Sequence, residues 1–246
     1  MNQWDPITVQ ELHLDIHTHT IASGHAYGTI REMAAAAQEK HLELLGISEH
    51  GPSIPGTCDP IYFRNLGVIP RNLYGVKMMF GCEINVLNDG TLSLDQREID
   101  LLDYGICGIH TLCYHDEGRE GNTDHLISCM RNDKVHFVSH PDDDHTPLNY
   151  ERLVAAAREY HVALEVNNSS LLKQQARWNC VANYHEMLKL CAAIQVPVIV
   201  SSDAHDPSFV GRFDEAVQLL NEMQFDRRLI LNESVDRFRQ FIGADR

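Results

Sequence analysis

Two patterns of hydrophobic and polar positions alternate along most of this chain. Short apolar runs rich in Val, Ile and Leu are followed by longer segments in which apolar residues recur every three or four positions. The apolar runs predict seven β-strands, at 12–19, 42–50, 78–87, within 99–110, 135–140, 162–170 and 196–205. The other segments predict helices at 29–40, 124–132, 150–160, 180–194 and 213–223, and a last amphipathic helix at about 234–242.

This strand–helix rhythm predicts a parallel sheet, either doubly wound or closed into a barrel. Thr29 is a plausible N-cap for the first helix. The segment 51–60 is rich in Pro and Gly, and the segment 111–122 is polar, so both are predicted to be loops. We find no repeat, low-complexity tract or linker, and therefore expect a single domain over residues 1–246.

Histidines and carboxylates gather at the predicted strand ends. The chain has 15 histidines, which is a high share for 246 residues. Nine candidate ligands end or directly follow strands: His17, His19, His25, His50, Glu83, His110, His140, Asp203 and His205. The carboxyl ends of parallel strands form the face where α/β folds build their active sites. A single histidine at a strand end is usually structural, but nothing structural requires nine candidates on one face, so the set indicates a metal site.

The local spacing also favours metal binding. His17 and His19 are two residues apart on a strand, so both rings point to the same face and can share an ion. Asp203 and His205 repeat this spacing. Imidazole and carboxylate together suit zinc, manganese or iron(II). Asp15 shares the face of His17 and is a possible acceptor for an imidazole N–H.

Net charge and cysteine content disfavour several classes of protein. The formal net charge of −15 argues against a protein that binds the nucleic-acid backbone, and simple solubility also explains it. The seven cysteines include no CxxC pair, and several lie in apolar runs, which favours buried thiols and a reducing cytoplasm. No signal segment or membrane span is predicted. The sequence does not reveal the oligomeric state.

Seven motifs resemble the PHP superfamily, named for polymerase and histidinol phosphatase, and most closely its stand-alone, YcdX-like phosphatase branch. In chain order they are LDIHTHTIASGHAYGTI, GISEHGP, GCEINV, GIHTL, VSHPDD, ALEVNNSS and SSDAHDP. The resemblance implies a distorted seven-stranded (β/α)7 TIM-like barrel with three divalent metal ions, zinc above all, or Mn²⁺ or Fe²⁺. It assigns one ion to His17, His19, Glu83 and Asp203, a second to Glu83, His110 and His140, and a third to His25, His50 and His205.

The resemblance further implies a metal-dependent phosphatase that hydrolyses a small phosphomonoester. A hydroxide bridging the ions would be the nucleophile, with Glu83, Asp203 and His205 as catalytic residues. A water beside His205 is the alternative donor of a proton to the leaving group. Arg71, Lys173 and Arg177 are candidate phosphate ligands. The loops after His110 and at 171–178 depart from the family pattern, and we expect both to contact substrate.

Other functions remain open at this level. An amidohydrolase-type metal hydrolase also begins with HxH, but it typically needs a bridging lysine at the end of the fourth strand, where this chain has His110. A phosphodiesterase or nuclease, and a histidinol-phosphate phosphatase, would use the same centre. A metal-binding protein without catalysis is disfavoured by the complete ligand set.

Overall fold

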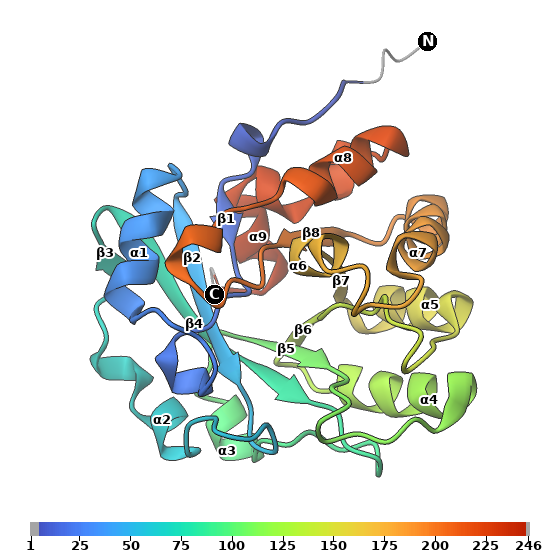
Figure 1. The fold of residues 1–246 in the computed structure, drawn as a ribbon, viewed down its shortest axis with the longest axis horizontal. Coiled ribbons are helices and arrows are strands. Elements are labelled where there is room, and N and C mark those ends of the chain that lie inside the picture. Colours follow the sequence, from blue (N-terminus) through green and yellow to red (C-terminus); the bar gives the residue numbers. More distant parts are fainter. Residues whose placement is uncertain (1–4, 245–246) are drawn as a thin grey trace.

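Seven parallel strands form the centre of the computed structural model, which describes residues 5–244. They lie in the order β1 (Leu14–Asp15), β2 (Leu44–His50), β4 (Val76–Asn85), β5 (Tyr104–Gly108), β6 (Val135–Val138), β7 (Ala163–Asn167) and β8 (Val198–Ser201). A bridge between Thr18 and Ala204 brings the two edges of the sheet together beyond β1 and β8. The strands therefore form a nearly closed barrel, which is one of the two arrangements that the strand–helix rhythm allowed and the one that the family resemblance implied (Figure 1).

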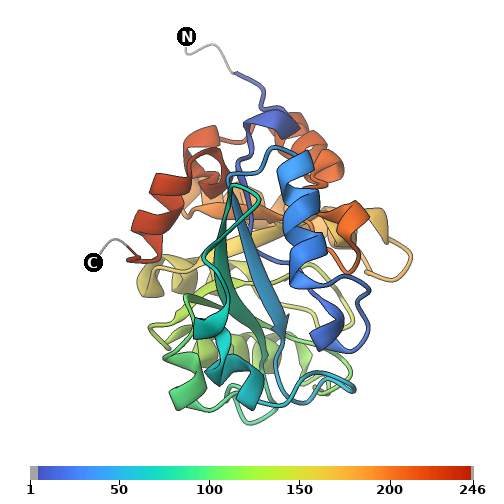
Figure 2. The ribbon, with the colours of Figure 1, turned by 90° about the vertical axis from the view of Figure 1, so that its left-hand side faces the viewer.

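Helices surround the strands. Their bounds are α1 (Ile30–Glu39), α2 (Ile61–Arg64), α3 (Gln96–Ile99), α4 (Gly118–Met130), α5 (Tyr150–Tyr160), α6 (Asn168–Leu172), α7 (Cys180–Ile194), α8 (Asp214–Glu222) and α9 (Val235–Phe241). Figure 1 shows α4, α5 and α7 on one side of the barrel and α1 on the other, and Figure 2 shows α1 running alongside the strands. All residues of β2 are buried because both faces of the barrel wall are covered.

The predicted N-cap of α1 is confirmed. The Thr29 side chain accepts a hydrogen bond from the Glu32 backbone, and the Glu32 carboxylate accepts one from the Thr29 N–H at 2.8 Å. This capping box satisfies donors that the first turn leaves free. Met33, Ala34 and Ala37 form the buried face of the helix.

The seam between β1 and β8 is closed by side chains from distant segments. The Asn232 amide donates to the carbonyl oxygens of Leu14 at 2.9 Å and Val200 at 2.7 Å, and its oxygen accepts from the Val200 N–H at 2.7 Å. Asp15 accepts from the backbone N–H groups of Ser202 at 3.2 Å and Gly211 at 3.0 Å. Polar side chains thus take the place of a missing ladder between the first and last strands.

Several boundaries differ from the sequence prediction. The regular ladder of the first strand is limited to Leu14 and Asp15, although the chain stays beside β2, where the Ser48 N–H donates to the Thr18 carbonyl oxygen at 2.9 Å. Helix α4 begins at Gly118, inside the segment 111–122 that was predicted to be a loop. The strand predicted at 162–170 ends at Asn167, whose side chain caps α6 by accepting from the Ser170 N–H. The short hairpin strand β3 (Asn72–Leu73) was not predicted.

All seven cysteines lie within the described residues and are free thiols, five of them buried. This agrees with the prediction that they form no disulfide framework. Within residues 5–244, none of the helices combines the length and apolar character needed to cross a membrane.

Candidate metal centre

The predicted ligands meet at the carboxyl ends of the strands. His50 ends β2, Glu83 lies near the end of β4, and the others follow β1, β5, β6 and β8. His25 comes from the loop after the short 3₁₀ turn Ile21–Ser23. Gly24 shapes this loop: its φ is +83°, and a Cβ there would lie 2.1 Å from the carbonyl oxygen of Gly56. The Pro- and Gly-rich loop 51–60 therefore packs directly against the segment that carries His25.

Glu83 is the centre of the cluster and is fully buried. Its two carboxylate oxygens lie 2.8–3.6 Å from ring nitrogens of five histidines, namely His17, His19, His50, His110 and His140. A carboxylate with imidazoles around both oxygens can bridge two ions.

Asp203 joins the cluster from β8. Its Oδ1 lies 3.7 Å from Nε2 of His17, 3.4 Å from Nε2 of His19 and 3.4 Å from Nδ1 of His205. Asp203 has a φ of +51°, and His140 has a φ of +28°. Positive φ is costly for residues with a Cβ, so the surrounding structure holds both residues in these orientations.

A third group of rings lies at the outer side of the cluster. The ring centroids of His25 are 4.9 Å from those of both His50 and His205. Nε2 of His25 and Nε2 of His205 are 3.2 Å apart. The structure thus brings all nine predicted ligands together.

Unpartnered buried atoms show that this cluster fits metal ions. Nε2 of His17, Nε2 of His19, Nδ1 of His50 and Oε2 of Glu83 are buried without a hydrogen-bond partner. Buried polar atoms are normally paired, because an unpaired one costs roughly 1–3 kcal/mol. Three groups offer ligand atoms within 4.8 Å of one another: His17–His19–Glu83, His50–Glu83–His110 and His19–His50–His205.

Glu83, His19 and His110 have protonation states that suit metal binding. Burial would lower the pKa of His17, but the carboxylates beside it, Glu165 above all, hold it well above its usual value. Burial would raise the pKa of Glu83, but the adjacent histidines hold it well below its usual range. Burial lowers the pKa of His19 well below its usual value and that of His110 to about 4. A neutral imidazole and an ionised carboxylate are the forms that bind metal ions.

Glu165 was missed by the sequence analysis. One of its oxygens lies 2.6 Å from Nδ1 of His17, and the other accepts the backbone N–H of His140 at 2.7 Å and the Asn167 amide at 3.0 Å. Nδ1 of His17 thus faces Glu165, and Nε2 faces the cluster. Asp15 was predicted to accept from an imidazole, but it accepts backbone N–H groups at the β1–β8 seam instead. The alternation in LEVN was the available signal, because it places Glu165 and Asn167 on one strand face.

A second buried acid supports His19 through a serine. The Ser23 hydroxyl donates to Glu49 at 2.6 Å, accepts the backbone N–H of His50 at 3.0 Å and lies 3.0 Å from Nδ1 of His19. Since its one proton goes to Glu49, the hydroxyl must accept from Nδ1–H of His19. Nε2 of His19 then keeps its lone pair for a metal ion.

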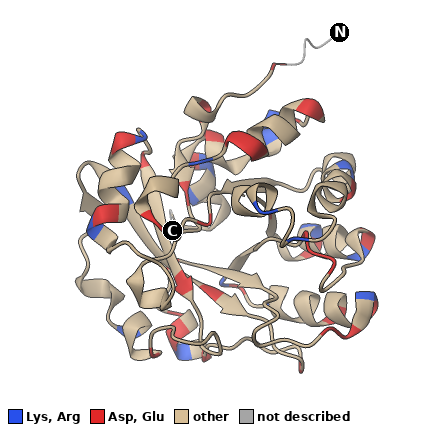
Figure 3. Cartoon of the chain, viewed as in Figure 1, with Lys and Arg blue, Asp and Glu red and all other residues tan. Residues whose placement is uncertain are grey.

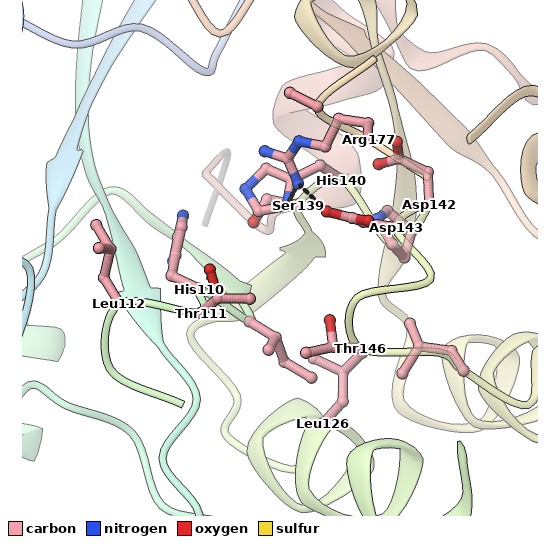
Figure 4. Close-up of a pocket in the computed structure, with 14 residues that line it drawn as sticks. His110, Thr111, Leu112, Leu126, Ser139, His140, Asp142, Asp143, Thr146 and Arg177 are labelled. Atoms are coloured by element: carbon pink, nitrogen blue, oxygen red, sulfur yellow. Dashed lines mark hydrogen bonds and ion pairs between the residues drawn. The ribbon is translucent and has the colours of Figure 1, made fainter. Parts of the chain in front are cut away.

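The three predicted phosphate ligands lie in different places. Arg177 points toward His140, with its guanidinium 3.3 Å from Nδ1 of that ring, in a cavity of about 210 Å³ (Figure 4). Lys173 lines a separate cavity of about 410 Å³ beside Asp203 and His205. Both belong to the segment 171–178 that was expected to contact substrate.

Arg71 requires a correction. It pairs with Asp103, the residue directly before β5, and its guanidinium covers the Phe80 ring at 5.0 Å. These contacts lie at the amino ends of the strands, whereas the cluster lies at the carboxyl ends. Arg71 therefore stabilises the wall of the barrel and does not reach the metal centre.

Comparisons with known proteins agree with this geometry. The PHP domain family model matches residues 15–245. A probable phosphatase of Caldicellulosiruptor saccharolyticus is 36% identical over 233 residues, covering 94% of this chain and 96% of that protein. A probable phosphatase of Caldanaerobacter subterraneus is 40% identical over 242 residues, which cover 95% of this chain and 92% of that protein.

Two solved structures share the fold at low sequence identity. The histidinol phosphate phosphatase of Lactococcus lactis, solved with zinc, L-histidinol and phosphate, has a TM-score of 0.60 at 16% identity and covers 87% of this chain and 95% of its own. A chain of an archaeal ribonuclease P, solved with mature tRNA, has a TM-score of 0.59 at 15% identity. The match covers 94% of this chain and 90% of that chain.

Proposed function

Since this chain belongs to the PHP domain family, we propose that it is a metal-dependent phosphatase acting on a small phosphomonoester. The observation that carries the proposal is Glu83 among five imidazoles, with unpartnered ligand atoms turned toward it. The names of the curated relatives support the same class of reaction. The amidohydrolase alternative loses support, because Glu83 rather than a lysine lies where a bridging ligand is needed.

Nine residues would hold up to three divalent ions, with zinc as the proposed metal and Mn²⁺ or Fe²⁺ as alternatives. His17, His19, Glu83 and Asp203 would hold one ion, Glu83, His110 and His140 a second, and His25, His50 and His205 a third. Bound ions would neutralise phosphate oxygens and lower the pKa of water to near neutrality.

The chain's own residues would orient the reacting groups. Asp203 reaches the cluster from β8 and would orient the attacking water. Arg177 would donate to phosphate oxygens, for which a planar guanidinium is well suited. Nδ1 of His205 lies 3.1 Å from the Asp203 carbonyl oxygen, which holds its N–H away from substrate. A water beside His205, rather than the ring itself, would therefore protonate the departing ester oxygen, which leaves as the alcohol.

The experiment that tests this function combines metal analysis with hydrolysis of a generic aryl phosphate. We expect two to three ions per chain, activity that a chelator abolishes, and recovery when zinc or manganese is restored. Retained activity after complete removal of metal would contradict the proposal. Metal binding with hydrolysis of amides or lactones, but not of phosphate esters, would assign the centre to another reaction.

Replacing Arg177 by alanine should raise KM for the phosphate ester by about tenfold or more, since a charge-assisted contact to phosphate is lost. Arg177→Lys should recover only part of this effect, because lysine cannot form the paired hydrogen bonds of arginine. Steady-state kinetics would measure both changes. Arg71→Ala is the matched control, because Arg71 lies at the opposite ends of the strands. An unchanged KM in Arg177→Ala would remove Arg177 from the phosphate site.

The surface charge supports a small substrate. Asp and Glu occur on α1, α4, α5 and α8, and the whole chain carries a net charge of −15 (Figure 3). Such a surface repels a nucleic-acid backbone over long range, so we do not propose a nuclease. Five buried free thiols fit a reducing compartment, and we propose a cytoplasmic location.

A further inference from the structure

Two cavities flank the metal-ligand cluster. The smaller one, of about 210 Å³, adjoins His110 and His140, and the larger one, of about 410 Å³, adjoins Asp203 and His205. The segment after α6 contributes to both cavities, because Lys173 lines the larger and Arg177 lines the smaller. A phosphoryl group bound at the cluster could therefore extend its ester oxygen into either cavity.

The larger cavity has both apolar and polar lining residues. Tyr27, Leu172 and Phe209 supply large apolar side chains, and Asp203 and His205 of the cluster line the same cavity. Tyr27 is 78% exposed and Phe209 is 42% exposed. Two exposed aromatic side chains beside a catalytic cluster cost solubility and contribute little to the core. Ligand pockets typically combine such apolar walls with a few placed polar groups.

Local contacts hold the backbone at Tyr27 and the ring of Phe209 in place. The Tyr27 backbone N–H donates to the carbonyl oxygen of His205 at 2.8 Å, which ties its segment to a metal ligand. Phe209 ends a 3₁₀ turn that Asp206 caps, and the Arg212 guanidinium lies 5.5 Å from the centre of its ring. The cavity is thus largely formed before any ligand binds.

We propose that the larger cavity binds the leaving group, and that the preferred substrate is a phosphate ester of an alcohol with a flat, apolar body, most simply an aromatic ring. This proposal rests on the phosphatase function. The ring would pack against Tyr27, Leu172 and Phe209, while the phosphoryl group remains at the cluster. Lys173 and Arg212 also line this cavity and add positive charge that favours an anionic ester.

The test compares benzyl phosphate with ethyl phosphate. Both esters release alcohols of similar acidity, so the ratio of their kcat/KM values reports binding of the ring rather than leaving-group reactivity. We expect wild-type protein to prefer benzyl phosphate by about tenfold or more, from burial of the aromatic ring. Benzylphosphonate should inhibit more strongly than ethylphosphonate by a similar factor, which tests binding without turnover.

Three aromatic-to-alanine variants locate the ring. Phe209→Ala should lower the benzyl-to-ethyl ratio by at least about fivefold, since part of the apolar wall is lost. Trp178→Ala alters an aromatic residue next to Arg177, on the side of the smaller cavity, and Tyr74→Ala alters one in the β3–β4 turn. The ratio should be unchanged in both.

Three results would overturn the proposal. Equal kcat/KM for the two esters in wild-type protein would show that no ring-binding cavity operates. Collapse of the ratio in Trp178→Ala but not in Phe209→Ala would place the ring on the other side. Hydrolysis of neither ester by metal-loaded protein, together with amide or lactone hydrolysis, would instead remove the phosphatase function itself.

Discussion

Replacing His17 by alanine is expected to lower phosphatase activity at least about a thousandfold and to remove at least one metal ion per chain, because a metal-assisted reaction loses a ligand. His17 is fully buried, with Nε2 facing Glu83 and Nδ1 facing Glu165. The barrel should stay folded, since Glu165 keeps its hydrogen bonds to His140 and Asn167. Metal analysis, kinetics and circular dichroism would measure the three outcomes.

His13→Ala is the control for this prediction. His13 lies four residues earlier and is partly exposed, and its ring nitrogen lies 3.4 Å from the carboxylate of Glu43, away from the cluster. We expect it to keep metal content and activity. Full activity in His17→Ala would refute the metal centre, whereas loss of activity together with loss of the folded spectrum would call for repetition with His17→Asn.

Replacing Glu165 by glutamine is expected to weaken metal binding by about 10–100-fold and to lower activity at limiting metal by a similar factor. Glutamine keeps the shape of the side chain but loses the negative charge that faces Nδ1 of His17 at 2.6 Å. It also presents an amide where the carboxylate accepts the His140 N–H. Competition with a chromogenic chelator would measure the change in affinity.

Assays with excess metal distinguish a role of Glu165 in orienting the histidines from general damage to the fold. If Glu165 acts by orienting His17 and His140, saturating zinc or manganese should restore most of the activity of Glu165→Gln. Wild-type metal affinity in this variant would show that the contact is only structural. Glu43→Gln alters an exposed acid that pairs with His13 and should change neither quantity.

The residues of the candidate metal centre could be predicted to lie together because strand direction alone brings them to one face. His17, His50, Glu83 and His140 are far apart in sequence, but each lies at or beyond the carboxyl end of a parallel strand. In a barrel all such ends meet on one face. Their positions therefore required only the strand–helix rhythm and not the details of packing.

The supporting residues could not be predicted in this way. Glu165 and Glu49 lie within strands, where an acid gives no sign of which imidazole it will face. Ser23 gains its role from the fold of one turn, which places its hydroxyl between Glu49 and His19. Arg71 was misplaced because a lone arginine in a loop carries no information about which end of the barrel it joins.

Short helices and strands could also not be predicted from the sequence. The β3 hairpin and α6 have two and five residues, which is too short for a hydrophobic period to appear. Helix α4 begins in a polar stretch without a side-chain N-cap hydrogen bond, so its first turn resembles a loop. These elements depend on the surrounding tertiary structure rather than on local preference.

The seam of the barrel has a consequence for the order in which the centre can be built. Asn232 bonds to Leu14 across 218 positions, and Asp15 bonds to Ser202 across 187. A ribosome releases His17 and His19 long before Asp203 and Asn232. A growing chain would therefore expose His17 and His19 before Asp203, a later member of the same candidate site, has been made. The nine candidate ligands can then come together only after the ribosome has released the chain through Asp203 and Asn232, so the complete set would assemble late in synthesis of the described residues.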